Sequence, residues 1–214
     1  MAMTQLGEAV KSTNMPLAQS YVEEALETFR GLGSSVEVGM ALRQLGLFAH
    51  HEGKYEQATA YHTESLALWR ALDHPWGVPA ALRELADDAL ALGRLDDAER
   101  QYRESLVRWR ALGERMHMSD CLFGLVRVSL ASKDAARAAM LLGAKDSLDE
   151  SMGYFPARES LAEVVQQVRN ALGESVFAEQ WELGRARALE DVLDEITADV
   201  VDTGGWDDPW PGAL

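Results

Sequence analysis

Apolar residues recur along the chain at spacings of three and four, in blocks that lie forty residues apart. In the clearest block they stand on either side of a polar turn at Gly53. This spacing places the apolar side chains on one face of an amphipathic helix, so each block predicts two helices joined by a turn. Residues of this block return forty positions later: Leu42, Leu45, Gly53, Ala58, Glu64, Ser65 and Trp69 recur as Leu82, Leu85, Gly93, Ala98, Glu104, Ser105 and Trp109.

A fixed period of this length is typical of repeat proteins, in which each unit buries its apolar face by stacking on its neighbours. We therefore predict an all-α fold, a right-handed superhelical solenoid of helix hairpins. The predicted repeats are residues 1–34, 35–74, 75–114 and 115–149, the last of them degenerate. In the last repeat, Lys133 and Asp134 replace the glycine turn.

One aromatic residue stands near the end of the second helix in each of the first three repeats, at Phe29, Trp69 and Trp109. Large aromatic side chains bury a large apolar area. We predict that they act as wedges between successive hairpins.

After residue 149 the periodicity changes phase. Two amphipathic stripes are centred on Val168 and Val192, and a third helix is expected around Trp181. We predict that residues 150–200 form capping helices over the last hairpin, since a solenoid needs its terminal apolar face covered. Residues 201–214 are acidic and aperiodic, and are predicted to be a flexible tail. Whether Trp206 and Trp210 dock in a groove or stay idle is left open.

The hairpin residues resemble a tetratricopeptide repeat. The resemblance rests on Leu42, Leu45, Gly46 and Ala49 in the first helix, followed by Gly53 and Ala58. The second helix is longer than usual, as in MalT-like units of about forty residues. The resemblance implies that the first helix of each hairpin lines a concave groove that binds a peptide or protein.

A second resemblance covers the C-terminal part. The segments 138–144 and 170–191 are similar to the end of bacterial signalling ATPases and LuxR-type transcriptional regulators. The resemblance implies a sensor or adaptor role. The family's nucleotide and DNA binding are not carried over to this chain, because its sequence has neither a phosphate-binding GxxxxGK[ST] loop nor a basic recognition helix.

The charge balance narrows the possible partners. The chain carries a net charge of −15, which opposes direct binding to nucleic acid or to an anionic membrane. Cys121 is the single cysteine, so we expect no internal disulfide and a buried or half-buried thiol. We expect a cytoplasmic protein, because no apolar run approaches the roughly 18 residues of a membrane span.

The residues with reactive side chains do not form a recognisable catalytic or metal-binding motif. The histidines lack metal-ligand spacing, His62 occupies the packing position of Tyr102 in the next repeat, and the pair Asp87-Asp88 is interpreted as a solvated surface. We therefore expect no enzymatic activity, no cofactor and no metal.

The groove supplies the candidate site. Arg43 and Arg83 occupy equivalent positions one repeat apart, and two guanidinium groups can clamp a carboxylate. In the alternative interpretation they pair with Glu84 and Asp87 and bind nothing. The candidate groove residues are Arg43, Gln44, Leu47, His50, Arg83, Glu84, Asp87, Phe123 and Arg127.

Three functions remain open at this point. The first is a scaffold that binds a protein or peptide partner. The second is a small-molecule receptor or enzyme with its pocket in the groove. The third is an array that mediates self-association.

Overall fold

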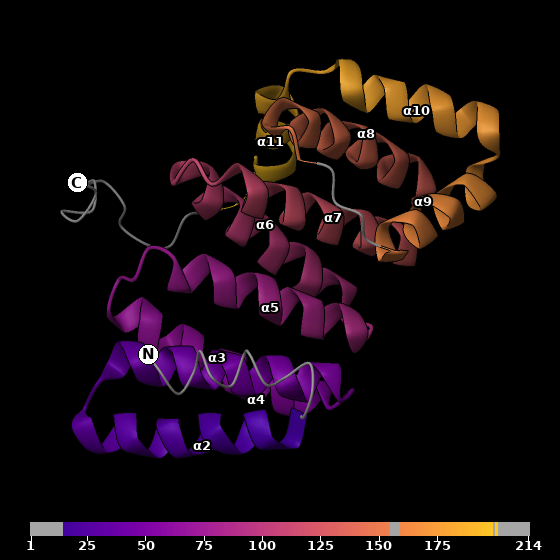
Figure 1. The fold of residues 1–214 in the computed structure, drawn as a ribbon. Helices are drawn as coiled ribbons and strands as arrows, with labels where there is room; N and C mark the ends of the chain where they lie inside the picture. Colours follow the sequence, from indigo (N-terminus) through magenta and orange to yellow (C-terminus); the bar gives the residue numbers. More distant parts are fainter. Residues whose placement is uncertain (1–14, 155–158, 199, 201–214) are drawn as a thin grey trace. The chain divides into compact units, whose positions relative to one another are not determined.

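In the computed structural model, residues 15–154, 159–198 and 200 are described. This part of the chain is all-α, which confirms the predicted fold class, and no strand occurs in it (Figure 1). The helices are α2 (Met15–Leu32), α3 (Ser35–His51), α4 (Tyr55–Ala71), α5 (Gly77–Ala91), α6 (Leu95–Ala111), α7 (Arg115–Ala131), α8 (Ala135–Met152), α9 (Glu159–Leu172), α10 (Glu174–Ala186) and α11 (Leu189–Thr197).

The described residues fall into two compact units, one ending at Arg94 and the other beginning at Leu95. In the first unit each helix packs on the next, from α2 to α5, and α3 also contacts α5. Its core joins α2 to α3 through buried residues such as Val22, Leu42 and Phe48. Helices α3 and α5, the first helices of successive hairpins, therefore lie next to each other within this unit.

The turns between paired helices depend on one residue with positive φ. Gly53 has φ 74° after α3, as the predicted turn requires. In the degenerate repeat the same place is taken by Lys133, which has φ 65°. A side chain makes this conformation less favourable than glycine does, by about 1–2 kcal/mol. Asp134 offsets part of that cost, because its side chain accepts a hydrogen bond from the backbone N–H of Arg137 at 3.0 Å and so caps α8.

Trp69 is a wedge of the predicted kind. Its indole ring is buried and lies against two glycines, Gly39 on α3 and Gly77 at the start of α5. A Cβ added at Gly77 would come within 2.3 Å of the ring, so the absence of a side chain there lets the next hairpin approach. Trp109 is likewise buried, whereas Phe29 is only partly buried against the first core.

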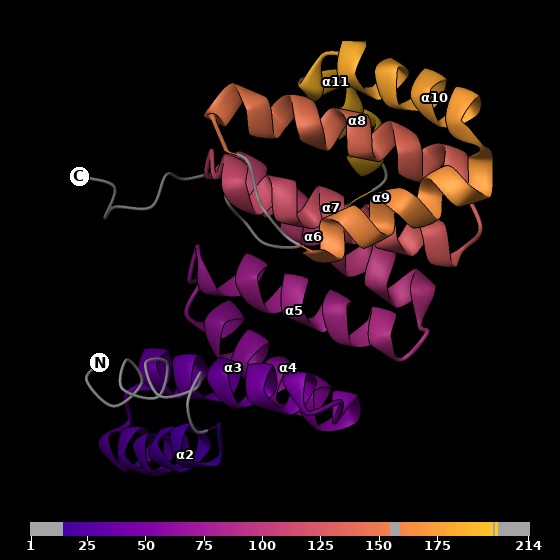
Figure 2. The ribbon, with the colours of Figure 1, turned by 45° about the vertical axis from the view of Figure 1, so that its right-hand side comes forward.

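In the second unit, α10 lies alongside α8 in both views (Figure 1, Figure 2). The two backbones touch at Gly143 and Gly184. A Cβ on Gly143 would lie 2.0 Å from the carbonyl oxygen of Trp181, and one on Gly184 would lie 1.9 Å from that of Met140. These two glycines belong to the segments that carry the second resemblance, and they are what allows the helices to cross so closely.

After α8, helices α9 and α10 pack on α8, and α11 contacts α6 as well as α8. Helix α8 spans position 149, where the predicted last repeat ends, and ends at Met152. The predicted opening helix of the first repeat and the predicted tail at 201–214 lie outside the described residues. No helix in the described ranges is long and apolar enough to cross a membrane.

Candidate functional site

The first helices of the hairpins share one pattern of exposure. On α3, α5 and α7 the half-exposed residues recur at forty-residue intervals, while their neighbours are buried. The recurring half-exposed residues are Arg43, Leu47 and His50, then Arg83, Asp87 and Leu90, and then Phe123, Arg127 and Leu130. Of the predicted groove residues, Gln44 and Glu84 are instead buried. The pattern thus separates side chains that a partner can reach from those that hold the helices together.

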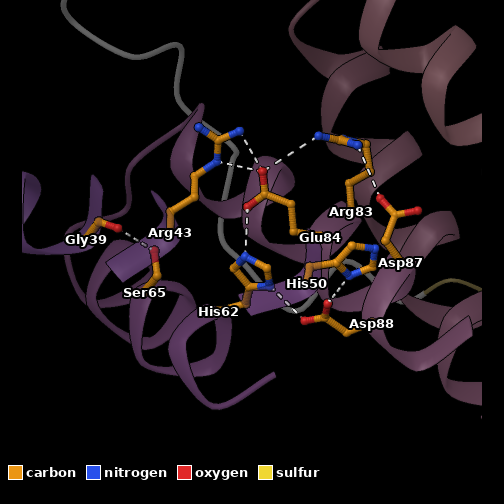
Figure 3. A network of polar contacts seen from close by, with 9 residues as sticks. All are labelled: Gly39, Arg43, His50, His62, Ser65, Arg83, Glu84, Asp87 and Asp88. Atoms are coloured by element: carbon orange, nitrogen blue, oxygen red, sulfur yellow. Dashed lines mark hydrogen bonds and ion pairs between the residues drawn. The ribbon is translucent and has the colours of Figure 1, made fainter. Parts of the chain in front are cut away.

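In the first unit both candidate arginines point at one carboxylate (Figure 3). Arg43 donates from Nε to Glu84 Oε1 at 2.7 Å, and its Nη2 lies 2.5 Å from the same oxygen. Arg83 approaches that oxygen with Nη2 at 3.6 Å and pairs through Nη1 with Asp87 Oδ2 at 3.3 Å. The side chain of Glu84 is 2% exposed, compared with 35% for Arg43 and 24% for Arg83. The chain therefore supplies a buried carboxylate of its own to the arginine pair.

A second buried carboxylate, Asp88, is shared by two histidines. His50 Nδ1 lies 2.6 Å from Asp88 Oδ1, and His62 Nδ1 lies 2.7 Å from Asp88 Oδ2. Asp88 is fully buried, whereas 29% of the His50 side chain is exposed. Burying a carboxylate is unfavourable unless hydrogen-bonded partners replace its water, and here each oxygen has one imidazole.

His62 connects the two carboxylates. Its ring lies between Asp88 and Glu84, with Nε2 3.8 Å from Glu84 Oε2. Neither of those two atoms has a hydrogen-bond partner, although both are buried. The ring fits because Gly46 on α3 faces it: a Cβ there would lie 2.2 Å from Nε2. One polar cluster, the α3–α5 cluster, thus joins α3, α4 and α5.

The charges of the α3–α5 cluster nearly cancel. Two guanidinium groups contribute +2 and three carboxylates contribute −3, which leaves −1 when both imidazoles are neutral. The resting contacts are those of the alternative interpretation, in which the arginines pair with Glu84 and Asp87. A ligand carboxylate would meet a pair of arginines that already has internal partners.

The interpretation of Asp87-Asp88 as a solvated surface pair is wrong for Asp88, which is fully buried. His62 is buried as a packing residue should be, yet it also bonds Asp88. The repeat itself carries the signal that was missed. Forty residues before and after Asp88 stand Phe48 and Val128, both buried, so a charged residue there had to be buried and partnered.

Other candidate chemistry is limited in the part of the chain that the structure describes. No group of three or more His, Cys, Asp or Glu residues in the described ranges is placed to hold a metal ion. Cys121 is fully buried, as expected, and its Sγ lies 3.4 Å from Ser105 Oγ.

The comparison with known families agrees with the repeats seen here. A family model described as Tetratricopeptide repeat matches residues 37–111. The match begins within α3 and ends with α6, so it includes every residue of the α3–α5 cluster. No curated protein matches the chain. The match therefore supports tetratricopeptide repeats at residues 37–111.

Proposed function

We propose that the chain is a protein-interaction scaffold that holds a peptide or protein partner along the half-exposed face of its first helices. The premise is the tetratricopeptide repeats at residues 37–111, a fold commonly used for protein–protein interaction. The observation that carries the proposal is the convergence of Arg43 and Arg83 on one oxygen of Glu84. Their half-exposed guanidinium groups are held in place before any partner arrives, which lowers the entropic cost of binding.

A partner carboxylate is the group that this arrangement fits best. Arg43 uses Nε and Nη2 on Glu84, and Arg83 holds Asp87 at 3.3 Å, a longer contact than that of Arg43. A carboxylate arriving from solvent would compete with Asp87 for Arg83 and bridge to Arg43. Leu47 on the same face of α3 offers an apolar contact beside this polar end.

The proposal includes the finer assignments suggested by the sequence. They are a relationship to bacterial LuxR-type or ATPase regulators, a part in transcription regulation or signalling, and a cytoplasmic location. The close crossing at Gly143 and Gly184 supports the relationship in one respect, because it gives a physical reason for the glycines in the resembling segments. Phe123 and Arg127 on α7 belong to the proposed binding face of the second unit.

The test compares partner capture by the wild-type chain and by the double variant Arg43→Gln/Arg83→Gln. Each charge-assisted hydrogen bond to a carboxylate contributes about 1.5–3 kcal/mol. We therefore expect specific partners, quantified by mass spectrometry after capture from a native lysate, to fall by about tenfold or more. Glutamine is chosen because it still donates to Glu84 and so spares the buried carboxylate.

A matched control removes the same charge elsewhere. Arg94 and Arg100 are exposed, and Arg94→Gln/Arg100→Gln should capture the same partners as the wild-type chain. Circular dichroism checks that all three chains are equally helical. Equal capture by the Arg43/Arg83 variant and by the wild-type chain would refute the proposed binding face.

One observation favours a second candidate function, a small-molecule receptor or enzyme with Arg43, Arg83 and His50 as ligand contacts. His50 is oriented by a buried carboxylate, since its Nδ1 lies 2.6 Å from Asp88 Oδ1. Such an imidazole is fixed for directional contact with a ligand. Native mass spectrometry of the freshly isolated chain tests this: a bound metabolite that the His50→Phe variant lacks would favour the receptor over the scaffold.

A further inference from the structure

The short helix α11 is attached to the second unit differently from α10. Where α10 crosses α8 with touching backbones, Arg185 also forms two hydrogen bonds to Glu150, at 2.7 and 2.8 Å. Trp181 adds a bond from Nε1 to Asp146 at 3.0 Å. These contacts are extensive and specific to one pairing of helices. They make the contact of α10 with α8 more extensive than any contact of α11.

By contrast, α11 is held by three apolar side chains and a few polar contacts. It has nine residues, of which Val192, Leu193 and Ile196 are buried. Isolated helices of this length are marginal in water. The connection from α10 runs through Arg187 and Ala188, both in extended conformation. Detachment of α11 would therefore not require α10 to unwind.

The surface of α6 and α8 that α11 covers is called the seat of α11. Two arginines on α6 form its polar contacts with α11. Arg110 donates from Nη1 to Asp194 at 2.7 Å and from Nη2 to Glu190 at 2.5 Å. Arg103 donates from Nε to the carbonyl oxygen of Ile196. The two carboxylates are largely exposed, so these pairs add orientation and specificity more than affinity.

We propose that the surface of α6 and α8 beneath α11 is a docking site for an acidic amphipathic helix of a partner protein, and that α11 is its resident occupant. The occupant defines the motif that the site accepts. Two adjacent apolar residues are followed by a third one turn later, and of two acidic residues four apart one precedes the apolar pair and the other directly follows it. This site lies on helices other than α3 and α5, so it is independent of the interaction face proposed above.

An occupied site has a reduced apparent affinity for a second ligand, in proportion to the fraction of molecules in which the site is open. The test uses the full chain and a fluorescent, end-blocked synthetic peptide of residues 188–198. Leu193 is fully buried, so Leu193→Asp should release α11 from its seat. We expect the peptide to bind this variant at least tenfold more tightly than the wild-type chain.

The charge contacts provide a rescue experiment. Adding Arg110→Glu to Leu193→Asp should weaken the peptide about fivefold, because it turns two weak attractions into repulsions. A peptide with Glu190→Arg and Asp194→Arg should bind that double variant better than the original peptide does. If the peptide were held by apolar contacts alone, Arg110→Glu would not weaken its binding and the arginine peptide would not restore it.

The control is Leu183→Asp, the same substitution at a half-exposed leucine on α10, which should leave the peptide affinity at the wild-type value. Hydrogen exchange of the α11 amides reports whether the helix is released. If Leu193→Asp fails to fold, Val192→Ala/Ile196→Ala gives the same test with a smaller gain. Release of α11 without any gain in peptide affinity would overturn the proposal.

Discussion

Equivalent positions of the repeat form a contact of ionisable side chains in the first unit and a contact built around one aromatic ring in the second. In the first unit the contact between α4 and α5 consists of His62, Glu84 and Asp88, all buried and ionisable. Both carboxylates depend on partners, because Asp88 has His50 and His62 while Glu84 has Arg43. This contact is stable only as a complete set.

Forty residues later the corresponding residues are Tyr102 on α6 and Gly124 and Val128 on α7, all within the second unit. A Cβ at Gly124 would lie 2.2 Å from the Tyr102 ring, so the phenol occupies the space that a side chain at that position would need. One large ring thus fills the volume that two polar side chains share in the first unit. Stacking of successive hairpins requires that volume to be filled, and it tolerates either chemistry.

The largest expected effect comes from breaking the polar contact with one substitution. Asp88→Val leaves His62 Nδ1 buried without its acceptor and leaves His50 without its anchor. Removing one partner of a buried ionic set costs about 3–5 kcal/mol. We expect a loss of this size in the free energy of unfolding, measured by urea titration of the full chain.

The companion variant Asp88→Asn keeps the shape and one acceptor, so its loss should be smaller, about 1–3 kcal/mol. Unfolding of Asp88→Val at the wild-type urea concentration would mean that the cluster does not hold α3, α4 and α5 together.

A much smaller effect is expected when the whole contact is exchanged. The triple variant His62→Tyr/Glu84→Gly/Asp88→Val copies the second unit into the first. It leaves no fully buried charge, because Arg43 and His50 are half-exposed and can be hydrated. Replacing a buried ionic set by well-packed apolar residues is often neutral. We expect the free energy of unfolding to stay within about 1 kcal/mol of the wild type.

The matched comparison for the triple variant is His62→Tyr/Asp88→Val, which keeps Glu84 beside the new phenol. It should be less stable than the triple variant although it has fewer substitutions. If the triple variant is the weaker of the two, the contacts are not interchangeable and the comparison between the units fails.

Much of the architecture could be predicted from the sequence, because it depends on periodicity and on backbone conformation. The hairpins follow from the apolar spacing, and the turn at Gly53 and the wedge at Trp69 follow from residue types with few alternative uses. The seat of α11 on α6 could not be predicted in this way. The apolar spacing along α11 predicts that Val192 and Ile196 are buried. It does not indicate which helix buries them.

The candidate site was only partly predictable for a related reason. Helical spacing showed that Arg43 and Arg83 share a face with Glu84 and Asp87, and the structure pairs them. It could not show that Glu84 turns inward, since position within a helix does not fix burial for a long acidic side chain. For Asp88, comparison between the repeats does predict burial, because the residues at the equivalent positions, Phe48 and Val128, are apolar.

The smallest expected effect concerns Asp146, a carboxylate of the second unit that depends on a neutral donor. It accepts a hydrogen bond from Trp181 Nε1 at 3.0 Å. Burial raises the pKa of Asp146 above its ordinary value of 3.8, and the Trp181 bond opposes this only in part. A raised pKa in the folded state means that the carboxyl group favours folding when protonated, and that this contribution is lost as the pH rises through the folded-state pKa.

Asp146→Asn should therefore stabilise the chain near pH 7, by about 0.5 kcal/mol because the group keeps part of its solvent. The amide oxygen can still accept from Trp181, so the gain reports the charge alone. It should shrink as the pH falls through the raised pKa of Asp146, where the wild-type carboxyl group takes up its proton. Urea titrations between pH 4 and 7.5 measure this, with Glu163→Gln as the exposed control that removes the same charge. A gain that did not change with pH would show that ionisation of Asp146 is not its source. The charge of Asp146, which has one neutral donor, would then be no more costly to bury than the charge of Asp88, which has two imidazole partners.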